Sequence, residues 1–160
     1  MIDLTTTHFG PIRFDEDDIL TFSGGVPGFW HATRFLLLPH PSKASICYLQ
    51  SADIPSLRFI LVAAFSVVPG YELSVEPWDI QHLLPPGSTS SGRALDQSEL
   101  DSWFIISTPQ ADRVTINMLA PVVICRKSRR GVQAVRSDTR YSHAFQLDSS
   151  AIELARRPVC

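Results

Sequence analysis

The chain has 160 residues, of which 44% are apolar and 19% charged, and this length and composition predict one globular domain. Its longest apolar run, Phe59–Phe65, is far shorter than the ~20 residues that span a bilayer, and its N-terminus lacks the basic and apolar regions of a signal peptide. Cys47, Cys125 and Cys160 are widely spaced, which indicates free thiols in a reducing, intracellular compartment.

Charge is distributed unevenly along the chain, although the net charge is only −2. Residues 1–125 carry 13 acidic and 6 basic side chains, whereas residues 126–160 carry 3 acidic and 8 basic ones. An acidic body followed by a basic C-terminal fifth is a pattern that often marks an interaction tail.

Short stretches rich in β-branched and aromatic residues recur along the chain, and many are bounded by Gly, Pro, Ser or Asp. Val114, Ile116 and Met118 alternate with their neighbours, as in a strand with one face on a core. Strands separated by turn signals indicate a barrel or a sandwich. We predict ten strands: Leu4–Phe9, Ile12–Phe14, Ile19–Phe22, Phe35–Leu38, Ile46–Gln50, Phe59–Phe65, Trp103–Ser107, Val114–Leu119, Val122–Arg126 and Val132–Arg136.

Helical signals are few. Trp78–Leu84 can form about two turns before the break at Pro85 and Pro86. Ser150–Glu153 has the spacing of a capping box, which predicts a short helix near the C-terminus. The period-2 runs place these side chains in the core: Phe22, Phe35, Leu37, Phe59, Leu61, Ile116, Val122 and Ile124.

Motifs for catalysis, metal binding and phosphate binding are absent from the sequence. The glycine-rich stretch Gly24–Gly28 lacks the lysine of a phosphate loop and is interpreted as a turn that uses positive φ angles. The five histidines have no metal-ligand spacing, and Asp15–Asp18 lacks the central glycine of a calcium loop. Cys47 and Cys125 lie in apolar strands and are expected to be buried. We therefore expect no enzyme, no cofactor and no metal, although a Ser-His-Asp triad assembled only by folding stays open.

The basic segment 126–140 has two interpretations. It contains Arg126, Lys127, Arg129, Arg130, Arg136 and Arg140, and clustered cations are what a phosphate backbone requires. A solvated turn between two strands, with Gly131 at its tip, explains the same residues, and only Tyr141 is available nearby for base stacking.

Several segments resemble the bacterial flagellar assembly factor family FliW, in the same order and over about residues 8–145. Ile19–Phe29 (ILTFSGGVPGF) is similar to the family's signature Ile-x-Phe-x-x-Gly-Leu-Pro-Gly-Phe. Val114–Ile124 (VTINMLAPVVI) is similar to its Thr-x-Asn-Leu-Leu-Ala-Pro-Ile-Val-Ile block and contains Asn117, the only asparagine of the chain. Weaker matches are Phe9–Ile12, Arg34–Leu38, Tyr48–Ser51, Ile54–Phe59 and Gly131–Val135.

The resemblance implies a mainly β, single-domain pseudo-barrel of short strands, with one or two short capping helices. This domain would occupy residues 1–147, and residues 148–160 would form a short helical extension. Members of the family are cytoplasmic and not enzymatic, and they bind flagellin and the translational repressor CsrA as mutually exclusive partners. The resemblance therefore implies a monomer that couples flagellin synthesis to export, with no membrane and no direct nucleic-acid contact. An RNA-binding barrel that uses residues 126–140 is the alternative.

Three features depart from the family pattern. Ala63 and Ala64 replace a common Asp-Pro pair, the isoelectric point near 6.2 is less acidic than is typical, and the chain extends past the usual end. We hypothesise a flagellin-binding groove that uses Pro27, Gly28, Phe29, Thr115, Asn117, Leu119 and Pro121. We further hypothesise that an acidic patch steers the basic repressor, and this patch consists of Asp15, Glu16, Asp17 and Asp18.

Overall fold

A computed structural model describes residues 1–87, 96–110, 112–138 and 140–147. Its secondary structure is mainly β, as the sequence predicts. The elements, in chain order, are β1 (Ile2–Thr6), β2 (Gly10–Phe14), the 3-10 helix η1 (Glu16–Asp18), β3 (Leu20–Thr21), β4 (Arg34–Pro39), β5 (Ile46–Ser51), β6 (Arg58–Ala63), α1 (Ala64–Val67), α2 (Pro77–Leu83), the 3-10 helix η2 (Gln97–Glu99), β7 (Leu100–Gln110), β8 (Arg113–Cys125), β9 (Arg130–Gln133) and β10 (Phe145–Gln146).

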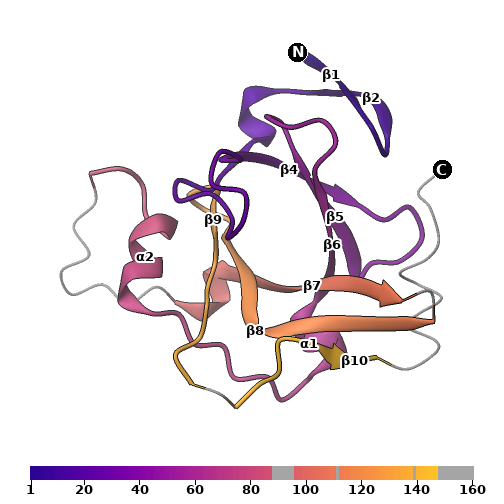
Figure 1. The fold of residues 1–160 in the computed structure, drawn as a ribbon. Helices are drawn as coiled ribbons and strands as arrows, with labels where there is room; N and C mark the ends of the chain where they lie inside the picture. Colours follow the sequence, from indigo (N-terminus) through magenta and orange to yellow (C-terminus); the bar gives the residue numbers. More distant parts are fainter. Residues whose placement is uncertain (88–95, 111, 139, 148–160) are drawn as a thin grey trace.

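The strands close into a barrel. The large sheet has the order β10-β8-β7-β6-β5-β4-β3-β9, and a further pairing of β8 with β9 closes the seven strands from β8 to β9 into a ring, with β10 attached outside it (Figure 1). All neighbours are antiparallel except β3 and β9, which meet at Thr21 and Arg130. The β1–β2 hairpin is a separate sheet at the top of the view in Figure 1, and α2 lies outside the ring beside β9. The predicted pseudo-barrel with short helices is confirmed.

The barrel interior holds the main hydrophobic cluster. Six of the eight predicted core residues are buried: five belong to this cluster, and Ile116 belongs to a second cluster. Leu37 and Phe59 are partly buried against the interior cluster. Along β5 the side chains of Cys47 and Leu49 join this interior cluster, whereas Ile46 and Tyr48 join the second cluster on the other face. Because both faces are covered, every residue of β5 is buried.

Two predicted strands, Val114–Leu119 and Val122–Arg126, belong to the single strand β8. The predicted strand Phe59–Phe65 is too long, because the chain turns into α1 at Ala64. The two-residue strand β10 was not predicted, since two residues carry no detectable period. The predicted helix Trp78–Leu84 corresponds to α2, which has Pro77 in its first turn. The helix expected at Ser150 lies outside the described residues.

The expectation that Gly131 forms the tip of the turn after β8 is wrong. Gly131 lies within β9 and is buried, and a Cβ atom built on it would stand 2.4 Å from Cζ of Phe22. The positive φ of the turn, 58°, belongs to Arg129 instead. Gly131 is therefore required by close packing across the barrel rather than by backbone conformation.

Candidate functional site

The glycine-rich segment Gly24–Phe29, which we call the signature loop, lies between β3 and β4 and packs on the barrel interior through Val26. The N–H of Phe29 donates to the carbonyl of Val26 at 2.7 Å, with Pro27 and Gly28 at the two central positions. Gly28 has a φ of 89°, which together with Pro27 is the pattern of a type II turn. Gly25 has a φ of 69°, and a Cβ there would stand 2.7 Å from the carbonyl oxygen of Trp30. The predicted use of positive φ at glycine is confirmed for both residues.

This turn leaves two aromatic rings on the surface. Val26 is buried in the interior cluster, which anchors the loop to the barrel. The ring of Phe29 packs edge-on against Phe59, with centroids 5.7 Å apart, but Phe29 is still 42% exposed. Trp30, the next residue, is 64% exposed. Exposed aromatic residues on a rigid turn are typical of protein-binding surfaces.

A pocket of about 210 Å³ separates the signature loop from α2. We call it the tryptophan pocket, because Trp30, which follows the signature loop, and Trp78 of α2, which is 60% exposed, both line it. A hydrogen bond of 2.7 Å between Ser23 Oγ and His82 Nδ1 holds the loop against α2. The other lining residues are Gly24, Gly25, Pro27, Asp79, Val132, Gln133 and Val135.

Of the predicted site residues, only Pro27 lines the tryptophan pocket; sequence reasoning missed Trp30, Trp78 and Val135. Two signals in the sequence could have drawn attention to these residues. Trp30 directly follows the signature, and Trp78 begins the predicted helix. Their proximity depends on the docking of α2 beside β9.

The second predicted segment forms an irregularity in β8. Trp103 on β7 pairs with Val122 and Ile105 with Asn117, so one residue of β7 faces four of β8, residues 118–121. Within this bulge the side-chain oxygen of Asn117 accepts hydrogen bonds from the N–H groups of Leu119, at 3.1 Å, and Ala120, at 3.0 Å. Asn117 thus replaces the strand partner that these two amides lose.

The carbonyls of the bulge are satisfied from other parts of the chain. The Tyr71 hydroxyl donates to the carbonyl of Met118 at 2.7 Å, and Gln133 Nε2 donates to that of Ala120 at 3.1 Å. The backbone N–H groups of Arg136 and Ala134 donate to the carbonyls of Leu119 and Pro121, respectively. A fully bonded backbone means that the bulge is a built feature of the barrel.

The bulge also determines how far the predicted groove residues are exposed. Thr115 and Pro121 are buried, and Asn117 and Leu119 are half-buried. Pro27, Gly28 and Phe29 are exposed. The two segments border the same interior cluster, since Phe29 packs on Phe59 and Asn117 pairs with Ile105. The signature loop therefore offers most of the accessible surface.

The acidic patch forms the turn around η1, and all four of its residues are exposed. The N–H of Asp15 donates to Oδ2 of Asp18 at 2.8 Å, and Oδ1 of Asp15 lies 3.4 Å from the terminal amino group. Glu16 and Asp17 have no such contacts within the described part of the chain. Two of the four carboxylates thus hold the turn, and two face solvent.

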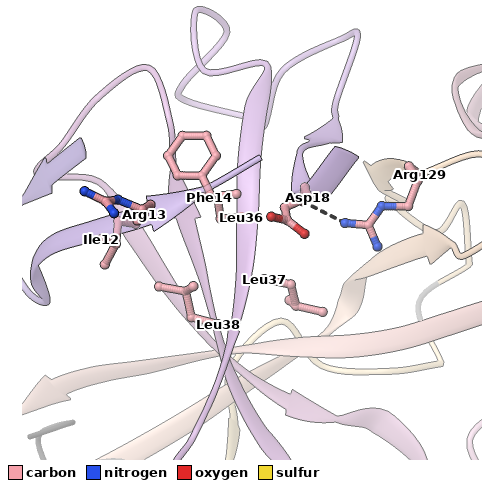
Figure 2. Close-up of a pocket in the computed structure, with 8 residues that line it drawn as sticks. All are labelled: Ile12, Arg13, Phe14, Asp18, Leu36, Leu37, Leu38 and Arg129. Atoms are coloured by element: carbon pink, nitrogen blue, oxygen red, sulfur yellow. Dashed lines mark hydrogen bonds between the residues drawn. The ribbon is translucent and has the colours of Figure 1, made fainter. Parts of the chain in front are cut away.

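Beside the acidic patch lies a second cavity of about 360 Å³, between β2 and β4. Figure 2 shows Ile12 and Phe14 of β2 near Leu36 and Leu38 of β4. At one side, Arg129 Nη2 donates to the backbone carbonyl of Asp18 at 2.7 Å, so a cation of segment 126–140 lies next to the acidic patch (Figure 2).

The arginines of segment 126–140 are bound to this chain. Residues 126–129 form the expected exposed turn, in which Arg126 pairs with Asp101. Arg130 Nε donates to the carbonyl of His82 at 2.9 Å, and Arg140 pairs with Glu72. These charges tie the C-terminal strands to the barrel.

Arg136 is buried, contrary to its expected place in a basic surface. Its side chain is 3% exposed, pairs with Asp138 at 2.9 Å and lies 4.9 Å from the ring centre of Tyr141. The hydrogen bond to Asp138 is the main reason that the pKa of Arg136 is raised. A guanidinium held in this way is not available to a phosphate.

Residue types for nucleophilic catalysis meet at the tryptophan pocket, but their geometry does not form a relay. Ser23 and His82 are hydrogen-bonded. Oδ2 of Asp79, however, accepts no hydrogen bond from the described residues. Within the same part of the chain, no group of three or more His, Cys, Asp or Glu side chains is arranged to hold a metal ion. Cys47 and Cys125 are buried as expected, and burial raises the pKa of Cys47.

No helix in the described residues is both long and apolar enough to cross a membrane. Comparison with known proteins matches residues 3–147 to the model of the family described as FliW protein. The flagellar assembly factor FliW of a Geobacillus species is 31% identical over 145 residues, which cover 90% of this chain and 94% of that protein. The corresponding factor of Heliobacterium modesticaldum is 30% identical over 146 residues, or 90% of this chain and 89% of the relative.

A solved structure extends this similarity to three dimensions. A crystal structure of the flagellar assembly factor FliW superposes with a TM-score of 0.76 at 28% identity, and the match covers 92% of this chain and 98% of that one. The sequence signature, the closed barrel and these matches agree, and the chain belongs to the FliW family of flagellar assembly factors.

Proposed function

We propose that this protein is a cytoplasmic binding factor for newly made flagellin, and that it acts by occupancy rather than by catalysis. The observation that carries the proposal is the signature loop, a hydrogen-bonded turn that is anchored in the barrel core by Val26 and exposes the ring of Phe29. Flagellin ends are amphipathic segments that order only when their apolar face is covered, so a carrier needs exposed apolar surface on a firm support.

The test compares two aromatic residues with similar exposure. Phe29→Ser removes the ring from the signature loop, and Phe145→Ser removes a ring that is 46% exposed on β10. We expect Phe29→Ser to weaken flagellin capture at least about tenfold, as for a central interface aromatic residue, and Phe145→Ser to leave it unchanged. Urea unfolding shows whether each variant is folded. Equal capture by folded Phe29→Ser and wild type would remove the loop from the site.

The second half of the proposed role is antagonism of the repressor CsrA, with exclusive binding of either partner. Support comes from the acidic patch, whose Glu16 and Asp17 are exposed and unengaged among the described residues. Opposite charge on a basic partner accelerates association at low salt. The alternative, RNA binding by segment 126–140, has less support, because five of its arginines contact carboxylates or carbonyls of this chain.

Steering is tested by association rates at low salt. Glu16→Gln/Asp17→Asn removes two charges from the acidic patch without touching the bonds of Asp15 and Asp18. The control Asp96→Asn/Asp112→Asn removes the same charge elsewhere, and Asn at 96 still accepts the bond from Ser98. We expect slower CsrA association only for the first variant. Equal rates for both would show that the patch does not steer.

A further inference from the structure

The tryptophan pocket has an unusual combination of lining groups. Two exposed indoles, of Trp30 and Trp78, flank an opening of about 210 Å³, which accommodates a single long side chain. The titratable residues that line it are Asp79 and His82. The Nδ1 atom of His82 is already engaged with Ser23, and Nε2 of Gln133, the other polar side chain of the lining, donates to the carbonyl of Ala120. The charged group left in the wall is the carboxylate of Asp79.

Asp79 has no partner to compensate for its burial. It is 8% exposed, and its Oδ2 atom accepts no hydrogen bond from the described residues. Burial is the main reason that the pKa of Asp79 is raised; the nearby His82 opposes this effect, and Glu76 adds a smaller contribution in the raising direction. A buried carboxylate without a donor is costly, and such a group normally marks a missing partner.

The chain does not supply that partner from the residues nearest the pocket. Arg130 is the cation that reaches α2, and its Nε donates to the backbone carbonyl of His82 rather than to Asp79. Gly24 and Gly25 line the loop side of the opening and carry no side chain that could fill it. Among the described residues none supplies this donor, and a donor from another molecule would complete the site.

We propose that the tryptophan pocket binds an arginine side chain of a partner protein, stacked on Trp30 and Trp78 and hydrogen-bonded to Asp79. A planar guanidinium stacks on indole rings and donates in a fork to a carboxylate, whereas the ammonium of lysine is more strongly hydrated and does neither as well. Stacking uses the exposed rings, and the fork supplies the donor that Asp79 lacks. The proposal does not rest on the flagellin and CsrA assignments above, although Pro27 of the hypothesised flagellin groove also lines this pocket.

The probe is the peptide acetyl-Ala-Arg-Ala-amide, titrated into ¹⁵N-labelled protein while the indole N–H signals are recorded. Trp103, the third tryptophan, packs against the barrel interior and serves as an internal reference. We expect saturable shifts for Trp30 and Trp78 and none for Trp103. Matched peptides with citrulline or lysine in place of arginine should bind about tenfold more weakly or worse, since they lose the charge or the planar fork.

Two variants test the role of the carboxylate. Asp79→Asn preserves the size of the side chain and removes its charge, and we expect it to weaken the arginine peptide about tenfold. Asp112→Asn, which removes one exposed charge between β7 and β8, should bind as wild type does. Unchanged binding by folded Asp79→Asn, absence of saturable shifts, equal binding of citrulline or lysine peptides, or equal shifts at Trp103 would each overturn the proposal.

Discussion

Asn117 allows a structural role and a binding role to be separated by one pair of substitutions. Its side-chain oxygen accepts from the N–H groups of Leu119 and Ala120 inside the bulge of β8. Asn117→Ala removes the acceptor and leaves both amides unpaired, whereas Asn117→Asp keeps an oxygen in the same place. The first variant should therefore disturb the barrel, and the second should not.

The magnitude follows from the environment of the two amides. Ala120 is 6% exposed, and an unpaired N–H in that position costs about 1–3 kcal/mol. Leu119 is half-buried, and its amide can find water, so its loss costs about 0.5–1 kcal/mol. Asn117→Ala should then lower the free energy of unfolding by about 1.5–4 kcal/mol, which is a large part of the ~5–15 kcal/mol typical of a domain. Asn117→Asp should stay within about 1 kcal/mol of wild type at neutral pH.

Urea denaturation measures the free energies, and amide hydrogen exchange at Leu119 and Ala120 locates the change. Faster exchange at these two amides in Asn117→Ala alone is the expected result. The reasoning fails if Asn117→Ala lies within about 0.5 kcal/mol of wild type, the range of ordinary surface substitutions, or if Asn117→Asp is equally destabilised. Loss of flagellin capture by stable Asn117→Asp would assign this residue to the binding site as well.

Three further outcomes are expected. Gly131→Ala should destabilise the protein by about 1–3 kcal/mol in thermal unfolding, because the added Cβ would overlap the ring of Phe22. A Tm equal to that of wild type would contradict this packing. Asp79→Asn should be more stable than wild type at pH 7. Because the pKa of Asp79 is raised in the folded protein, wild-type stability falls as pH rises from the usual Asp range through the raised value. The difference in free energy of unfolding between the two proteins should therefore disappear in acid, and a difference that does not change with pH would refute this explanation. Truncation after Leu147 should leave flagellin capture intact, and its loss from a cooperatively folded truncation would place residues 148–160 in the site.

Local patterns in the sequence were sufficient for most of the strands and for the main turn. Alternation from Val114 to Met118 in β8 reflects which side chains face a core, and Pro27-Gly28 encodes its turn through the backbone preferences of the two residues. The bounds of α2 are also local: Pro77 is favourable in its first turn, and Pro85 disfavours helical backbone at the residue before it, so the helix ends at Leu83. The order of these blocks along the chain was enough to indicate the FliW family, which the comparisons confirm.

Only the tertiary structure decided how these pieces meet. Gly131 is a contact for Phe22 and not a turn tip, and Arg136 faces Asp138 and not solvent. Both outcomes depend on pairings between β3, β8 and β9, which produce no periodic pattern in the sequence. The same holds for the tryptophan pocket, since Trp30 and Trp78 are 48 positions apart in the chain and meet because α2 packs beside β9. A sequence specifies each residue's local preference, but contacts between distant segments follow from strand register and barrel closure, which are properties of the whole chain.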